Sequence, residues 1–217
     1  MYESRLNEAK ELKVKATAFR NRGQLDRALA ALDKAIEALD SLQREKDLDS
    51  RSAVDVRAEL ADTYGMKGGI YRRLQQKQQA LTEYRKGLKI EQIDQQSTYN
   101  LSNVITLGIT EEHISPADPS MREMLDDAIK PLEEQVRGAR SDEWWALTDL
   151  AQFYLLANKP DEARSYYERA RKTGPTSQEY GRHIDILREL VEATKDNAPD
   201  ISKNIAATTA YLERYAR

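Results

Sequence analysis

The chain has 217 residues, of which 40% are hydrophobic and 33% are charged, and it has a net charge of -3 and no cysteine. This length allows one elongated repeat domain or two small domains. The mild acidity does not point to nucleic acid or to an anionic membrane as a partner. The lack of cysteine excludes disulfides and thiolate chemistry. No apolar run approaches the roughly 18–20 residues that span a bilayer, and the first residues are charged rather than apolar, so we expect a cytoplasmic protein with no membrane partner.

Apolar residues recur at helical spacing along the chain, and no stretch alternates for long enough to predict a strand. Turn-forming residues divide the sequence into about ten helices. We therefore predict an all-α fold with a single domain over 1–217, built from about five antiparallel helix pairs. The expected pairs are 3–46, 50–93, 96–138, 141–173 and 176–216.

The first two pairs share one spacing between small residues. Ala16 in the first helix precedes Ala28 in the second by 12 positions, and Gly68 precedes Ala80 by the same step. Two antiparallel helices approach closely only where a side chain is nearly absent, and larger residues then fill the groove beside that contact. The spacing predicts a close helix contact in each pair, with Gly23 in the first turn.

The second pair carries three glycines within one predicted helix. Each costs roughly 1 kcal/mol relative to alanine, so each needs a reason. Close packing accounts for Gly68, whereas Gly65 and Gly69 either let a ligand approach the backbone or soften the helix. The segment is not a phosphate-binding loop, because it lacks the preceding strand and the Gly-Lys-Ser/Thr ending.

The third and fifth pairs depart from this spacing. A long connection over 112–120 separates the helices of the third pair, and Ser120 with Glu123 predicts a capping box at the start of its second helix. Thr176 with Glu179 predicts the same cap for the fifth pair. The last helix, about 200–216, carries an apolar stripe that either caps the core or forms a dimer contact, so the oligomeric state stays open. The stripe consists of Ile201, Ile205, Leu212 and Tyr215.

The fourth pair shows the most regular pattern, with large and small residues at fixed spacing and a final proline. Its residues are Leu147, Leu150, Ala151, Tyr154, Ala163, Tyr167, Ala170 and Pro175. In this pattern the chain resembles the tetratricopeptide repeat family. The resemblance extends over 12–35 and 64–87. It implies a right-handed superhelix of helix pairs that binds a peptide or protein segment in a concave groove lined by the first helix of each pair.

The resemblance also implies which residues line that groove. They are Lys10, Lys13, Arg20, Asn21, Arg72, Arg73, Tyr99, Asn103, Trp145, Asp149 and Gln152. The amino-terminal half of this surface is basic, which predicts an acidic or carboxylate-bearing partner, since Arg and Lys give charge-assisted hydrogen bonds. The alternative is that these are ordinary solvated residues on helix faces. One subgroup of the family binds a partner's C-terminal carboxylate through a set of side chains called the two-carboxylate clamp. This clamp is not preserved here, because Thr17 and Met66 occupy the positions where the clamp needs Asn.

Other conspicuous residues predict no chemistry. Trp144 and Trp145 point about 100° apart on a helix, so either one ring packs inward and the other faces the groove, or both fill space. His113 and His183 have no metal-ligand spacing around them, and we expect both at the surface. No catalytic set, metal site or cofactor site is predicted.

Two functions remain as hypotheses. The first is a scaffold or adaptor that binds another protein or a peptide in the groove. The alternative is a regulatory sensor subunit whose superhelix responds to a ligand and controls a separate effector protein. Enzymatic activity is not expected, and a basic stripe on the first two pairs is the only feature that favours nucleic acid.

Overall fold

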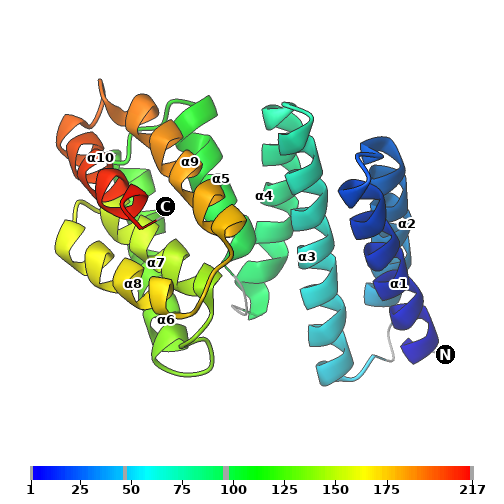
Figure 1. Cartoon of the computed structure of the whole chain (residues 1–217). Helices are drawn as coiled ribbons and strands as arrows, with labels where there is room; N and C mark the ends of the chain where they lie inside the picture. The colour runs from blue at the N-terminus through cyan, green and yellow to red at the C-terminus, as the bar shows by residue number, and fades with distance from the viewer. Residues whose placement is uncertain (1, 46–47, 95–97, 216–217) are drawn as a thin grey trace. The chain divides into compact units, whose positions relative to one another are not determined.

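The computed structural model describes residues 2–45, 48–94 and 98–215. Within these ranges the chain forms ten α-helices and no strand, which confirms the all-α array of helix pairs (Figure 1). The predicted pair boundaries at 46, 96 and 216 lie outside the described residues. The helices are α1 (Tyr2–Asn21), α2 (Leu25–Gln43), α3 (Ser50–Arg73), α4 (Lys77–Asp94), α5 (Tyr99–Glu111), α6 (Pro119–Arg137), α7 (Trp144–Leu156), α8 (Pro160–Lys172), α9 (Ser177–Thr194) and α10 (Pro199–Glu213).

The helices group into two compact units, residues 1–104 and residues 105–217, and the division falls within α5. In the first unit α1 packs on α2, α2 on α3, and α3 on α4. In the second, α6 packs on α7, α7 on α8, and α9 on α10, while α10 also contacts α7 and α8. The single domain and the right-handed superhelix stay predictions. Among the described helices, none combines the length and the apolar character needed to cross a bilayer.

The first helix of a pair ends in the same turn three times. The second residue after each helix has positive φ: Gly23 at 73°, Gln75 at 60° and Asn158 at 60°. The next amide then donates to the carbonyl five residues back, which closes the helix end. These bonds are Gln24 N to Phe19 O at 2.9 Å, Gln76 N to Tyr71 O at 2.9 Å, and Lys159 N to Tyr154 O at 2.8 Å.

The third pair keeps a variant of this turn, which its sequence did not reveal. His113 stands two residues after α5 and has a φ of 56°. Here the closing bond spans six residues, from Ile114 N to Gly108 O at 3.2 Å. His113 is exposed, as expected.

Three glycines let α3, α4 and α5 approach one another closely. A Cβ added at Gly68 would lie 2.8 Å from the ring of Tyr84, and one added at Gly65 would lie 2.8 Å from the ring of Tyr99. A Cβ at Gly87 would lie 2.5 Å from the side-chain amide of Asn100. Packing therefore explains Gly68 as predicted, and it also explains Gly65.

The cap of α9 is confirmed and that of α6 is not the predicted one. Thr176 N donates to Glu179 Oε2 at 2.8 Å, and Glu179 N donates to Thr176 Oγ1 at 3.2 Å, which is a capping box. Helix α6 instead begins at Pro119, with Asp118 accepting from Ser120 N at 3.1 Å. The reason is that proline, with its fixed φ and no N–H, suits the first helical position.

Helix α7 is the central helix of the second unit, because eleven of its thirteen residues are buried. Helix α10 buries the expected apolar residues Ile201, Ile205 and Leu212, whereas Tyr215 is exposed. These three side chains are therefore occupied by packing within their own unit.

We predict that Gly68→Ala destabilises the first unit. Alanine is the better helix former by about 1 kcal/mol, but its methyl group would press on the buried Tyr84 ring, and overpacking costs about 1–3 kcal/mol. The expected net loss in unfolding free energy is up to about 2 kcal/mol, measured by urea denaturation followed by circular dichroism.

Gly181→Ala is the matched control. Gly181 also lies inside a helix, α9, but nothing lies within 4 Å of an added Cβ. This variant should gain up to about 1 kcal/mol. A Gly68→Ala protein stabilised to the same extent would contradict the close-packing account.

Candidate partner-binding site

Helices α1 and α3 run parallel and in register within the first unit. Tyr2 Oη donates to Ser52 O at 3.2 Å near their beginnings, and Lys10 Nζ lies 3.5 Å from Glu59 Oε1 further along. The carboxyl ends of α1 and α3 therefore lie at the same end of the unit, beside the turns to α2 and α4 (Figure 1). The predicted groove residues Lys10 and Lys13 of α1 lie on the face that meets Glu59 and Asp62 of α3.

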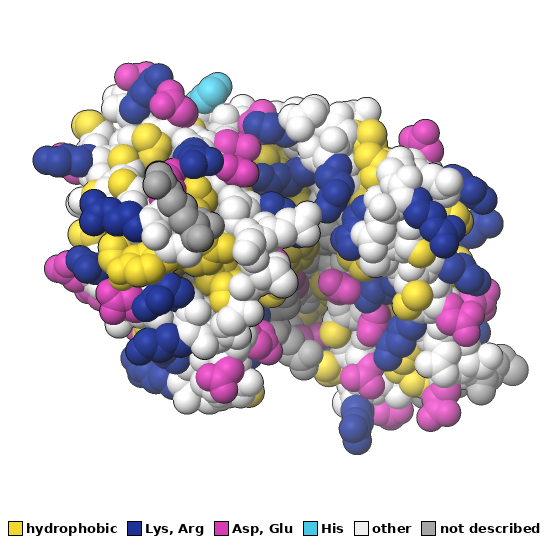
Figure 2. Space-filling model, viewed as in Figure 1, with side chains coloured by type: hydrophobic (Ala, Val, Ile, Leu, Met, Phe, Trp, Pro, Cys, Tyr) yellow, Lys and Arg dark blue, Asp and Glu magenta, His cyan; other side chains and the backbone are white. Residues whose placement is uncertain are grey.

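Carboxylates of α3 neutralise two of the predicted basic residues. Lys13 Nζ forms an ion pair with Asp62 Oδ2 at 2.6 Å and a second with Glu59, which also pairs with Lys10. Burial lowers the pKa of Lys13, but the attraction and hydrogen bonds of Asp62 and Glu59 outweigh it and the pKa is raised. Positive and negative side chains accordingly lie side by side over the right-hand part of Figure 2.

The cations at the turn end of this face have no such partners. Arg20 hydrogen-bonds to its neighbour Asn21 at 3.4 Å, and Arg73 is exposed. Within the described part of the chain neither arginine, nor the exposed Arg22 between the helices, forms an ion pair. We call Arg20, Asn21, Arg22 and Arg73 the turn-end surface.

Arg72, Tyr99 and Asn103 belong to one hydrogen-bonded network beside that surface. Arg72 donates to Asn103 Oδ1 at 3.0 Å, and Asn103 Nδ2 donates to Tyr99 O at 2.8 Å. The Tyr99 ring meets the Tyr84 ring edge-on, with 6.0 Å between centroids. Burial raises the pKa of Tyr84 well above its usual range, and Tyr99 adds to this while Arg72 opposes it. Tyr99 is still 42% exposed, so it packs and faces solvent at once.

The second unit divides its predicted site residues between surface and core. Trp145 is 45% exposed, whereas Trp144 is buried, and its ring is tilted by 33° against that of Tyr180 with 5.5 Å between ring centroids. Asp149 is half-buried. Gln152 is only 2% exposed and donates to Thr106 Oγ1 at 2.9 Å, so its placement in an open groove was wrong. Its side chain ties α7 to α5.

His183 is buried, contrary to the expected surface position. One of its ring nitrogens lies 2.9 Å from Tyr167 Oη, and burial lowers the pKa of His183 to about 4. The signal was present in the sequence, because the apolar stripe of Tyr180, Ile184 and Leu187 runs along the same helix face. Across the described ranges, no three His, Asp or Glu side chains lie close enough to hold a metal ion.

Comparisons with known proteins agree with the repeat pattern. Residues 61–94, covering the end of α3 and all of α4, match a model of the tetratricopeptide repeat, and residues 144–191, covering α7, α8 and most of α9, match another. No curated protein matches the chain. A solved structure of the TPR2AB domain of yeast Sti1 in its pHSP90 complex is 15% identical over 96% of this chain and 98% of that one, with a TM-score of 0.24.

The chain contains tetratricopeptide repeats over residues 61–94 and 144–191. Its helix pairs carry the family's small-residue contacts, and the two matched segments lie in different units. Repeats of this family form interaction scaffolds, which supports a scaffold for protein–protein interaction.

We predict that His183 makes the second unit sensitive to acid. The pKa of His183 is about 4 in the folded protein, below the ordinary value of 6.5. Between pH 6.5 and pH 4 the unfolded chain therefore binds a proton at this residue and the folded chain does not. The stability that this group contributes is present above pH 6.5 and is lost as the pH falls to 4, with a loss of about 3 kcal/mol. Both tryptophans lie in α7, so their fluorescence follows this unit in urea titrations.

His183→Gln keeps a polar side chain beside Tyr167 but cannot titrate. Between pH 7 and pH 4 its unfolding free energy should fall less steeply than that of the wild type. His113→Asn, at the exposed turn position, should keep the wild-type slope. An unchanged slope in His183→Gln would show that the buried imidazole is not the cause.

Proposed function

We propose that the chain is an adaptor that binds an acidic segment of another protein at the turn-end surface of its first unit. The observation that carries this proposal is the unequal neutralisation of cations along α1 and α3. Lys10 and Lys13 already hold carboxylates of α3, whereas Arg20, Arg22 and Arg73 hold none among the described residues. An incoming carboxylate gains most at guanidinium groups that face solvent without an acidic partner.

The proposed surface is narrower than the sequence predicted. A ligand that reached Lys13 would have to replace two carboxylates that are already in place, and breaking such a pair offsets the gain. Arg72 and Asn103 bind each other at the edge of the surface and position the end of α3. We therefore assign Lys10, Lys13, Arg72 and Asn103 to supporting the surface and the turn-end residues to contacting the partner.

The second unit offers Trp145 as a separate contact. Tryptophan is a frequent hot spot in protein interfaces. The Trp145 ring meets the Trp144 ring edge-on, with 6.3 Å between centroids, and is still 45% exposed on a helix that is otherwise almost fully buried. Asp149, one turn further along α7, is the polar neighbour on this helix. The regulatory-sensor alternative and the cytoplasmic location stay predictions.

Charge reversal at the turn-end surface tests the proposal. We expect Arg20→Glu/Arg73→Glu to fail to capture at least one protein that the wild-type chain captures from an extract of cells that express it. Once that partner is purified, the variant should bind it with at least a ten-fold weaker affinity than the wild type. Calorimetric titration at two salt concentrations measures the loss, and raising the salt should weaken wild-type binding.

The matched control is Lys34→Glu/Lys89→Glu, which makes the same charge change at exposed lysines of α2 and α4. It should bind like the wild type. A partner that binds all three proteins equally would refute the turn-end surface, and the absence of any captured protein would refute the adaptor function.

A further inference from the structure

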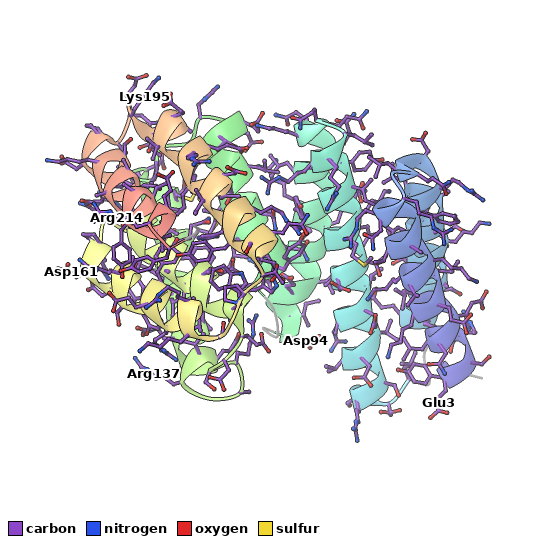
Figure 3. The ribbon with its side chains drawn as sticks, viewed as in Figure 1. Glu3, Asp94, Arg137, Asp161, Lys195 and Arg214 are labelled. Atoms are coloured by element: carbon purple, nitrogen blue, oxygen red, sulfur yellow. The ribbon has the colours of Figure 1, made fainter. Side chains whose placement is uncertain are left out.

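A hollow of about 320 Å³ lies in the second unit, between the end of α8 and the turn that joins α6 to α7. Lys and Arg side chains gather near this end of α8 (Figure 2), where Figure 3 labels Arg137. The lining contains no aliphatic or aromatic residue, so the hollow suits a polar ligand. The lining residues are Ser141, Asp142, Arg169, Lys172 and Thr173.

The turn beside the hollow is held in shape by Arg140. Its backbone N donates to Gln135 O at 2.9 Å, and its Nη1 donates to Gln135 Oε1 at 2.9 Å. Its Nε pairs with Glu143 Oε2 at 2.6 Å, so these two charges neutralise each other. The next two residues, Ser141 and Asp142, therefore line the hollow from a turn that is already ordered.

Ion pairs leave the charges of the lining itself uncompensated. Arg137, which does not line the hollow, pairs with Glu133 at 3.4 Å. Among the described residues, neither Arg169, Lys172 nor Asp142 forms an ion pair. The lining therefore has two positive charges and one negative charge, which leaves one net positive charge.

Arg169 is fixed at the edge of the hollow by two contacts. Its Nη2 donates to Val136 O, at the end of α6, at 2.9 Å. Its guanidinium carbon lies 5.2 Å from the centroid of the Tyr166 ring. Guanidinium carries five N–H donors, so most of them remain for a ligand.

Two further donors belong to the lining. Lys172 Nζ and Ser141 Oγ form no hydrogen bond with another described side chain or backbone group. Thr173 differs, because its hydroxyl donates to Ala170 O at 2.8 Å and can only accept from a ligand. Donors therefore outnumber acceptors in the hollow, and the side chains that supply them are Arg169, Lys172 and Ser141.

We propose that this hollow binds a carboxylate of a partner protein, carried by an aspartate or glutamate side chain. Arg169 and Lys172 would donate charge-assisted hydrogen bonds to its two oxygens, and Ser141 would add a third bond. One net positive charge matches one carboxylate. A phosphate group carries about -1.5 to -2 charges near pH 7 and would bring the additional charge against Asp142.

The hollow extends the adaptor proposal to a second acidic contact. It does not depend on the turn-end surface, because that surface belongs to the first unit. Lys172 and Asp142 are exposed, so solvent screens the site and a single carboxylate should bind weakly.

The test uses the full chain labelled with ¹⁵N and short peptides as probes. Acetyl-Ala-Glu-Ala-amide should shift the backbone amide signals of Ser141, Asp142 and Thr173 saturably in NMR spectra. The same peptide with glutamine, which is neutral and of nearly the same shape, should bind about five-fold more weakly. Absent shifts, or equal affinity for both peptides, would overturn the proposal.

A third peptide, acetyl-Ala-phosphoserine-Ala-amide, distinguishes the two kinds of anion. It should bind no more than a few-fold more tightly than the glutamate peptide, because Asp142 opposes its additional charge. An affinity ten-fold higher or more would show a phosphate site and overturn the assignment to a carboxylate.

Two variants should change the affinity in opposite directions. Lys172→Gln removes a donor and a positive charge, so the glutamate peptide should bind several-fold more weakly. Asp142→Asn removes the opposing charge, so the same peptide should bind more tightly. Stabilisation of the negative end of α8 by Lys172 does not produce these opposite effects.

The matched controls make the same charge changes elsewhere in the second unit. Lys203→Gln changes an exposed lysine of α10, and Asp161→Asn changes an exposed carboxylate at the start of α8, labelled in Figure 3. Neither residue lines the hollow, so both variants should bind the glutamate peptide like the wild type. Unaltered affinity in both Lys172→Gln and Asp142→Asn, or equal changes in the controls, would place the peptide elsewhere and overturn the proposal.

The same spectra separate this proposal from the proposed function. Arg20→Glu/Arg73→Glu should leave the shifts of Ser141, Asp142 and Thr173 unchanged, because neither arginine lines the hollow. Failure of the peptide test therefore overturns the carboxylate site alone. Equal partner capture by wild type and Arg20→Glu/Arg73→Glu overturns the turn-end surface alone.

Discussion

Close helix contact at positions without a side chain is the constraint on which the first unit depends. Tyr84 and Tyr99 lie against α3 only because Gly68 and Gly65 leave room for their rings, and Asn100 reaches Ala61 only because Gly87 leaves room for its amide. Without these contacts α5 would not start where it does. The exposed edge of Tyr99 follows from the same packing.

In the first unit, ion pairs between side chains decide which charges remain available to a partner, and the overall composition does not. Glu59 and Asp62 neutralise lysines of α1, and Asp94 holds Arg57, so much of the first unit carries compensated charge. A binding surface is distinguished by charged residues that have no oppositely charged neighbour. On α1 and α3 such cations lie at the turn end.

Local patterns predicted some local features correctly and missed others. The 12-residue step between small residues identified the close contact at Gly68, and Thr176 with Glu179 identified a capping box, because both depend on residues close in sequence. The start of α6 was misplaced because Asp118 and Pro119 form a competing cap two residues earlier. The positive φ of His113 was missed because the third pair has no glycine or asparagine at that position.

The sequence by itself determined that the chain is an all-α array of tetratricopeptide-type helix pairs, since helical periodicity and the spacing of small residues are properties of short segments. The tertiary structure alone decided which predicted groove residues face solvent. Lys13 is compensated by residues 46 and 49 positions away, and Gln152 is buried against Thr106. These outcomes depend on which helices pack together, and a pattern within one helix carries no information about its partner across the contact.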